Sequence, residues 1–365
     1  MAGFIYHDEY LRYQFGPFHP FKSIKYKLTF DLVNRLGVFD GKARYFKPEP
    51  ADAEALQLVH TREYVDFVKR MSDRGSGYLD YGDTPAAKGI YEAACFKVGG
   101  SVLGAELIMR GEAQHAFNVG GGMHHAKPGN AAGFCVFNDV AIAARHLQSR
   151  YGLKRIAIVD IDGHHADGTQ AIFYQEPILT ISTHREGIFF YPGTGFVDEI
   201  GEGEGKGYTV NIPLPPGTND DIYLWAFNEV IPPLIREYHP EIILNQFGVD
   251  GHYQDPLVGL ALTTITYEAV ASTMHQLAHE VCNGRYLIFG GGGYNPNNAA
   301  KCWTIMFTTI SQALPERSSE EYAELFDKTK SPSNRTLFNE VKNTVEKLKR
   351  LIFPLHGLKP SRSKS

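Results

Sequence analysis

The chain has 365 residues, of which 43% are hydrophobic, and its formal net charge is −5. These values are typical of a globular protein with a large core, and the acidic balance gives no electrostatic reason to expect a nucleic-acid partner. The four cysteines, none in a CxxC pair, argue against a disulfide framework and against a thiolate zinc site, so we expect a cytoplasmic protein. The sequence predicts neither a secretory leader nor a membrane span.

Short apolar runs alternate with segments of helical periodicity along the chain. In chain order, we expect strands at residues 3–7, 115–119, 156–159, 178–181, 208–212, 241–247 and 286–289. We expect helices at residues 23–36, with Ser23 as N-cap, and then at 52–58, 63–71, 86–109, 139–150, 220–237, 264–281 and 296–313. Residues 41–50 are expected to form a polar connection, and residues 72–85 a surface loop. This alternation predicts a single-domain, three-layer αβα fold around a mostly parallel sheet of about eight strands.

The C-terminal stretch is more polar than the rest of the chain. We therefore assign residues 1–314 to the catalytic domain and residues 315–365 to a helical extension that packs on it or trails from it. An amphipathic helix is expected at residues 337–351. The basic tail near residues 359–365 is expected to be disordered.

A cluster of polar residues follows the buried run at 156–159. Asp162 and His164 are two positions apart, so on an extended backbone they project to the same side. Asp250 comes just after the strand expected at 241–247, and the carboxyl ends of parallel strands meet at one edge of a sheet. An aspartate–histidine–aspartate set of this kind provides three metal ligands and leaves positions free for water and substrate. The alternative is that each is an ordinary polar residue at a strand end.

Two glycine runs also follow expected strands. Gly120–Gly122 leads into His124 and His125, which suit a general base and an electrostatic partner, with two carboxylates, Asp160 and Asp167, available to tune them. A structural turn is the alternative. Gly290–Gly293 leads into Tyr294, whose phenol could donate a hydrogen bond to a developing oxyanion.

Other kinds of chemistry have weaker support in the sequence. Neither glycine run has a nucleotide-binding pattern, and the absence of a GxSxG elbow argues against a serine hydrolase. Cys135 lies in an apolar context, which favours a buried thiol over a catalytic nucleophile. Phe134, Phe190 and Tyr191 are flanked by glycines and fit either an apolar channel or core packing. Metal-assisted hydrolysis is therefore the favoured interpretation.

Eight motifs occur in an order that matches one known family. They are HPFK (19–22), HTREYV (60–65), YGDTP (81–85), GGGMHHAKPGNAAGFCVFND (120–139), VDIDGHHADGTQ (159–170), YPGTG (191–195), GVDGHYQDPLVGLALT (248–263) and GGGGYNP (290–296). With them the chain resembles the histone deacetylase family, which has the arginase/deacetylase fold. It is most similar to the branch of bacterial and archaeal deacetylase-like and acetoin-utilisation (AcuC-type) proteins.

The resemblance implies hydrolysis of acyl groups from lysine side chains of a protein or peptide substrate. It implies that Zn²⁺, or Fe²⁺ in some conditions, is bound by Asp162, His164 and Asp250. His125 would be the general base, supported by Asp167, and His124 would be its electrostatic partner, supported by Asp160. Tyr294 would polarise the acyl carbonyl. The residues implied in substrate binding are Asp83, Gly133, Phe134, Tyr191 and Leu257. A structural K⁺ would be bound by Asp160, Asp162, His164, Ser182 and Thr183. His165 receives no chemical role and is expected to be structural.

Two departures and two alternatives accompany the resemblance. Lys25 stands where relatives usually have an arginine at the base of the pocket, which puts the route of acetate release in doubt. Ala166 replaces the carboxylate that a binuclear arginase needs, which argues against that chemistry. The other functions to weigh are hydrolysis of acetylpolyamines or other small amides and, against the intact set of catalytic residue types, non-catalytic binding of acyl-lysine. The sequence leaves acyl-chain length and oligomeric state open.

Overall fold

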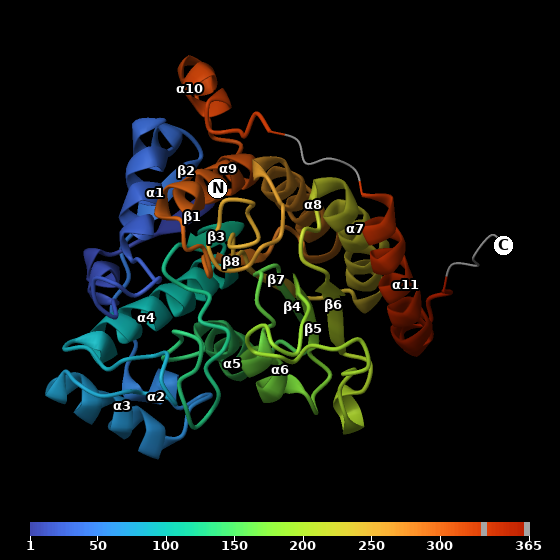
Figure 1. The fold of residues 1–365 in the computed structure, drawn as a ribbon. Helices are drawn as coiled ribbons and strands as arrows, with labels where there is room; N and C mark the ends of the chain where they lie inside the picture. Colours follow the sequence, from blue (N-terminus) through green and yellow to red (C-terminus); the bar gives the residue numbers. More distant parts are fainter. Residues whose placement is uncertain (330–333, 361–365) are drawn as a thin grey trace.

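The computed structural model describes residues 1–329 and 334–360. Eight strands form one sheet in the order β2-β1-β3-β8-β7-β4-β5-β6, and every pair of neighbours is parallel (Figure 1). The strands are β1 (Ala2–Ile5), β2 (Ala43–Phe46), β3 (His115–Asn118), β4 (Ile156–Asp160), β5 (Leu179–Arg185), β6 (Thr209–Leu214), β7 (Ile242–Gln246) and β8 (Tyr286–Phe289). The predicted three-layer α/β architecture is confirmed.

Helices cover both faces of this sheet (Figure 1). One layer contains α1 (Ile24–Arg35), α7 (Asp220–Tyr238), α8 (Thr264–Cys282), α9 (Pro296–Ser311) and α11 (Arg335–Ile352). The other is built on α4 (Ile90–Met109), α5 (Asp139–Tyr151) and α6 (Asp167–Phe173), with α2 (Ala53–Leu56) and α3 (Arg62–Arg74) beside them. The short α10 (Ser319–Ala323) follows α9 in the chain.

Strand β4 shows why the polar residues gather at one edge of the sheet. Ile156 and Ile158 belong to the core on one face, whereas Ala157 and Val159 belong to the core on the other. Successive side chains of a strand point to opposite faces, so a strand that is covered on both sides needs a continuous apolar run. The first polar side chain, Asp160, appears only where the strand leaves the core at its carboxyl end.

Two local predictions are wrong. Part of the expected polar connection is strand β2, which pairs only with β1 at the edge of the sheet. Its Arg44 and Tyr45 are exposed, so it lacks the continuous apolar run by which a central strand is recognised. Ser23 lies at the N-cap of α1 without capping it, because its Oγ donates to the carbonyl of Leu11 at 2.9 Å.

The C-terminal helix α11 packs against α7 and the edge strand β6. Its buried residues Val341, Val345, Leu348 and Ile352 recur at helical spacing and form one apolar stripe. The domain division after residue 314 stays a prediction. Residues 361–365 of the expected disordered tail lie outside the described residues. Within the described ranges, no helix is both long and apolar enough to cross a bilayer.

Candidate active site

Three proposed metal ligands meet where two neighbouring strands end. Asp162 and His164 follow β4, Asp250 follows β7, and β4 pairs with β7. The ligand atoms of the three side chains all lie within 4.8 Å of one another, and all three side chains are buried. His164 Nδ1 is 2.8 Å from Asp250 Oδ2 and 3.3 Å from Asp162 Oδ1. Sequence reasoning from strand ends thus selected residues that the fold brings together.

The second oxygen of each carboxylate is held by hydrogen-bond donors. Asp162 Oδ2 accepts from Gln246 Nε2 and from the backbone N–H of Gly292, both at 2.7 Å, and Asp250 Oδ1 accepts from the N–H of Gly163 at 2.6 Å. The other two oxygens, Asp162 Oδ1 and Asp250 Oδ2, point toward His164 Nδ1. This arrangement orients one oxygen from each aspartate toward a shared centre, as the outer shell of a metal site does.

The charges at this centre also favour a cation. Burial alone would lower the pKa of His164, but the carboxylates of Asp162 and Asp250 raise that pKa to about 10. Burial, together with the Asp162 charge, raises the pKa of Asp250 to about 7. The cluster therefore attracts positive charge, and a divalent cation satisfies two buried carboxylates better than a proton does. One imidazole nitrogen and two carboxylate oxygens fit Zn²⁺ or Fe²⁺.

The histidine pair lies in the loop after β3, and each ring is oriented by its own carboxylate. His124 Nδ1 is 2.8 Å from Asp160 Oδ2, and His125 Nδ1 is 2.7 Å from Asp167 Oδ1. The two Nε2 atoms are 3.0 Å apart. Asp167 also forms an ion pair with Lys127 at 2.9 Å. Both carboxylates that the sequence offered as tuning partners are thus within hydrogen-bond distance of a different histidine.

Their surroundings give the two imidazoles very different pKa values. Burial opposes protonation of His124, but the charges of Asp160 and Asp162 outweigh it and raise its pKa to about 9. Burial and the neighbouring His124 lower the pKa of His125 to about 4, despite Asp167. One ring is therefore cationic near neutral pH while the other is neutral and able to accept a proton. Such a separation of pKa values distinguishes an electrostatic partner from a base.

A tunnel of about 250 Å³ leads from the surface to this cluster. Its lining joins the reactive groups to all five residues predicted to bind substrate; it consists of Asp83, His125, Gly133, Phe134, His164, Phe190, Tyr191, Leu257 and Tyr294. Phe134 has a φ of 67°, and its backbone is held by Thr84 Oγ1 and by the hydroxyl of Tyr13. The rigid aromatic wall suits a long apolar chain that carries a polar group at its inner end.

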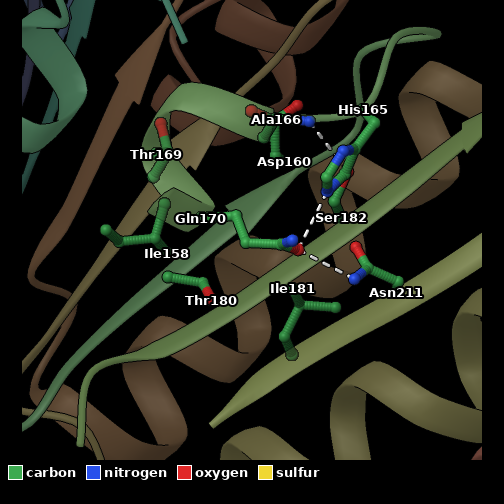
Figure 2. Close-up of a pocket in the computed structure, with 10 residues that line it drawn as sticks. All are labelled: Ile158, Asp160, His165, Ala166, Thr169, Gln170, Thr180, Ile181, Ser182 and Asn211. Atoms are coloured by element: carbon green, nitrogen blue, oxygen red, sulfur yellow. Dashed lines mark hydrogen bonds between the residues drawn. The ribbon is translucent and has the colours of Figure 1, made fainter. Parts of the chain in front are cut away.

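Two of the residues expected to bind K⁺, Asp162 and His164, also belong to the metal cluster, and the other three lie on β4 and β5. Asp160 of β4 is paired in register with Ser182 of β5, and Thr183 Oγ1 donates to the carbonyl of Asp160 at 3.4 Å. Figure 2 shows the neighbouring pocket, whose lining includes Asp160 of β4, Ser182 of β5 and His165 from the loop after β4. Potassium binding here stays a prediction.

His165 takes part in a hydrogen-bond network in the same pocket (Figure 2). Its Nε2 contacts Gln170 Oε1 at 2.9 Å, as Figure 2 shows. Its Nδ1 contacts Thr194 Oγ1 at 2.8 Å. Asn211 also donates to Gln170 Oε1. Both ring nitrogens are occupied, which agrees with a structural role for this histidine.

Residues 19–310 match the histone deacetylase domain. The chain belongs to the histone deacetylase family. It is 40% identical over 316 residues to the acetoin utilization protein AcuC of Bacillus subtilis (strain 168), covering 83% of this chain and 81% of that protein. It is 39% identical over 302 residues to a probable deacetylase of Archaeoglobus fulgidus, covering 82% and 83% respectively.

Two solved structures of the family share the fold over nearly the whole chain. The crystal structure of an HDA15 HD domain superimposes with a TM-score of 0.84 at 29% identity and covers 98% of each chain. The structure of an HDAC homolog complexed with SAHA gives a TM-score of 0.83 at 28% identity, covering 95% of this chain and 99% of the other. The predicted family, fold and AcuC-type branch are confirmed, and membership indicates deacetylase chemistry. The metal cluster described above fits the metal dependence of the family.

Sequence reasoning missed Gln246 and, for Phe190, left a channel and core packing open. Gln246 ends β7 and orients Asp162, and Phe190 stacks on His164 with ring centroids 5.0 Å apart. Gln246 carried a signal, because it is a polar residue at a strand end, four positions before Asp250. The structure decides for the channel, because Phe190 and Tyr191 both line the tunnel.

Lys25, the departure from the family pattern, is fully buried below the site. Its Nζ donates to the carbonyls of Gly291 and Gly293, at 2.9 and 3.1 Å, and so supports the loop that carries Tyr294. Burial lowers the pKa of Lys25 to about 8, against the opposing effect of Asp250 and Asp162. The lysine therefore holds the glycine run from beneath.

Proposed function

We propose that this chain is a Zn²⁺-dependent deacylase that hydrolyses the amide between an acyl group and a lysine side chain of a protein or peptide. Fe²⁺ is the second metal that its ligands suit. The observation that carries the proposal is the shared position of His125, His164 and Tyr294 at the inner end of the aromatic tunnel. A base, a metal ligand and a phenol then meet at one point, which an extended lysine side chain reaches with its amide.

The protein groups divide the steps of this mechanism, and His125 acts first as base and then as acid. Bound by its three ligands, the metal would lower the pKa of a water molecule and polarise the amide carbonyl. His125 accepts the water proton on Nε2, because its Nδ1 is bonded to Asp167. Tyr294 donates its hydroxyl to the oxyanion that develops on the substrate, and the cationic His124 stabilises the same charge. His125 then gives its proton to the leaving amine, and the products are lysine and a carboxylate.

The entrance of the tunnel supports a macromolecular substrate over a small amide. Tyr81 lies two residues from the tunnel-lining Asp83, and Phe189 lies next to Phe190; both rings are fully exposed. Phe18, 99% exposed, precedes His19, whose ring contacts Phe134. Exposed aromatic side chains around an opening are typical of a protein-binding surface.

Activity assays on metal-defined protein test the proposal. We expect Zn²⁺-loaded protein to cleave acetyl-lysine peptides with a higher kcat/KM than acetylputrescine. Replacement His125→Ala should lower kcat by about 10²- to 10⁴-fold, the contribution usual for a general base. Tyr294→Phe should lower kcat by about 10²- to 10³-fold, as removal of an oxyanion donor does. A preference for acetylputrescine would support the small-amide hydrolase instead. Unchanged function in both variants would favour the acyl-lysine binder.

Potassium is proposed as a structural ion held by the oxygen-rich strand ends around Asp160, Ser182 and Thr183. These residues adjoin the carboxylates that orient the catalytic groups, so K⁺ would fix β4 relative to β5. Dialysis of the Zn²⁺-loaded enzyme into sodium buffer should lower its melting temperature, and potassium chloride should restore it. An identical melting curve in both buffers would contradict this role.

A further inference from the structure

Three histidines meet where the strands of the sheet begin, at the end opposite the active site. His115 is the first residue of β3, whose other end leads to the catalytic loop. His275 and His279 lie on α8, one helical turn apart, and therefore project from the same face. A short turn joins α8 to β8, which pairs with β3 in the middle of the sheet (Figure 1). This turn brings the end of α8 onto the start of β3.

The three imidazoles have the spacing of ligands around one ion. One nitrogen of each ring lies within 4.8 Å of a nitrogen of each of the others. The Nε2 atoms of His115 and His279 are 3.2 Å apart. Ligand nitrogens around a tetrahedral Zn²⁺ are separated by about 3.3 Å, given Zn–N bonds of about 2.0–2.1 Å. One pair already has this separation, and a nitrogen of His275 lies within 4.8 Å of both.

Within the described residues, hydrogen bonding links His115 to His279 but leaves one ring nitrogen of His115 and one of His275 unpaired. His115 is only 4% exposed, and its Nδ1 has no hydrogen-bond partner there; the buried Nδ1 of His275 has none either. An unpaired buried polar atom is unfavourable, and an ion bound at Nδ1 of His275 would satisfy that atom, whereas Nδ1 of His115 lies across its ring from the Nε2 that faces His279. By contrast, other buried histidines of this chain use both ring nitrogens, as seen for His60, His165 and His184.

The backbone beside the cluster leaves room for the rings to meet. Gly284, in the turn between α8 and β8, has a φ of +78°, and a methyl group there would lie 2.9 Å from Cε1 of His279. A residue without a side chain therefore lets the turn close against the histidines. His279 is exposed and His275 half-buried, so the cluster also has access to solvent.

We propose that His115, His275 and His279 bind one Zn²⁺ ion at a second site, with the fourth position open to solvent. Imidazole nitrogens suit Zn²⁺, Cu²⁺ and Ni²⁺, and three of them form a known ligand set for zinc. The ion ties the carboxyl-terminal turn of α8 to the first residue of β3. Its role is structural, since the cluster lies at the amino-terminal ends of the strands, away from the substrate tunnel.

Zinc stoichiometry tests the second site in the full chain. Metal-stripped protein is titrated with ZnCl₂ against a chromophoric chelator. We expect two equivalents in the unaltered protein and one in His279→Ala, with deacylase activity unchanged in that variant because His279 is remote from the tunnel. The matched control His146→Ala, a partly buried histidine bonded to Glu106, should retain two equivalents. An equal zinc stoichiometry in the unaltered protein and in His279→Ala would overturn the proposal.

A second readout separates this site from the catalytic one. In Asp250→Asn the catalytic site is impaired, so Co²⁺ should give the visible absorption of a nitrogen-ligated tetrahedral ion from the histidine cluster alone. The band should disappear in the double variant Asp250→Asn/His279→Ala. If the band persisted in the double variant, the ion would reside elsewhere. The titration of His279→Ala decides the matter independently of whether Asp250→Asn folds.

Discussion

Gly292→Ala is expected to disable the enzyme by displacing the carboxylates that hold the metal. Gly292 lies in the run that leads to Tyr294, and its N–H donates to Asp162 Oδ2. A methyl group there would lie 2.7 Å from Asp162 Oδ2 and 2.7 Å from Asp250 Cγ, with Asp250 Oδ2 nearer still. Gly292 does not have a positive φ, so alanine adds a steric effect without backbone strain.

The size of the effect follows from these distances. Ordinary contact with a methyl carbon begins at 3.4 Å, so Asp162 Oδ2, at 2.7 Å, must move by about 0.7 Å and the nearer Asp250 Oδ2 must move further. A misplacement of about 1 Å typically costs about 10²-fold in rate, and a disturbed outer shell costs about 10- to 100-fold in metal affinity. We therefore expect kcat/KM of the Zn²⁺-loaded variant to fall by about 10- to 100-fold, together with weaker zinc binding.

The assay compares this variant with Gly129→Ala. Gly129 lies in the loop after the histidine pair and has nothing within 4 Å of the position of an added methyl group, so its replacement should leave zinc affinity and kcat/KM unchanged. Turnover of an acetyl-lysine peptide and zinc affinity are measured for both proteins, with thermal unfolding as a check on folding. A folded Gly292→Ala protein with unaltered zinc affinity and kcat/KM would refute the assignment of the cluster as the catalytic metal site.

Three further predictions concern the rim, the extension and a buried histidine. Burial and the neighbouring Asp80 raise the pKa of Asp83 to about 6. Its carboxylate should therefore protonate below that pH and release a bound peptide backbone. KM for acetyl-lysine peptides should rise between pH 7 and pH 5, and Asp83→Asn should remove this pH dependence. Leu348→Ala should lower the free energy of unfolding, measured by denaturant titration, by about 2–5 kcal/mol, because Leu348 is fully buried where α11 packs on the domain. A loss below about 0.5 kcal/mol would show that the extension is dispensable. Burial lowers the pKa of His60 to about 4 from 6.5, so its contribution is fully present above pH 6.5 and is lost as pH falls toward 4. Between pH 7 and pH 5 the unfolding free energy should therefore fall by about 2 kcal/mol less in His60→Gln than in the unaltered protein.

The sequence was informative where one local signal carried both structure and chemistry. Asp162, His164 and Asp250 follow apolar runs, and a parallel sheet brings the carboxyl ends of such runs together whatever the details of packing. The edge strand β2 had no comparable signal, since only one side of it is paired and half of its residues face solvent. The tunnel-facing side of Phe190 depends on the conformation of a loop, which hydrophobic periodicity does not describe.

The histidine cluster shows a second reason why a site escapes sequence reasoning. His275 and His279 have the spacing of a helical ligand pair, but their partner His115 lies 160 residues earlier, inside an apolar strand signal. Only the order of strands, with β3 next to β8, brings His115 to the end of α8.

The two clusters also differ in charge, and this difference fits their proposed roles. The catalytic set contains two carboxylates, which neutralise a divalent ion and hold it in a buried tunnel. The histidine set contributes no negative charge, so a bound Zn²⁺ keeps its charge and is best accommodated where water reaches it. The exposed His279 and half-buried His275 provide such a place. The two proposed centres thus lie at opposite ends of the strands. The one with two carboxylates is buried at their carboxyl ends, and the one with only neutral ligands is open to solvent at their amino ends.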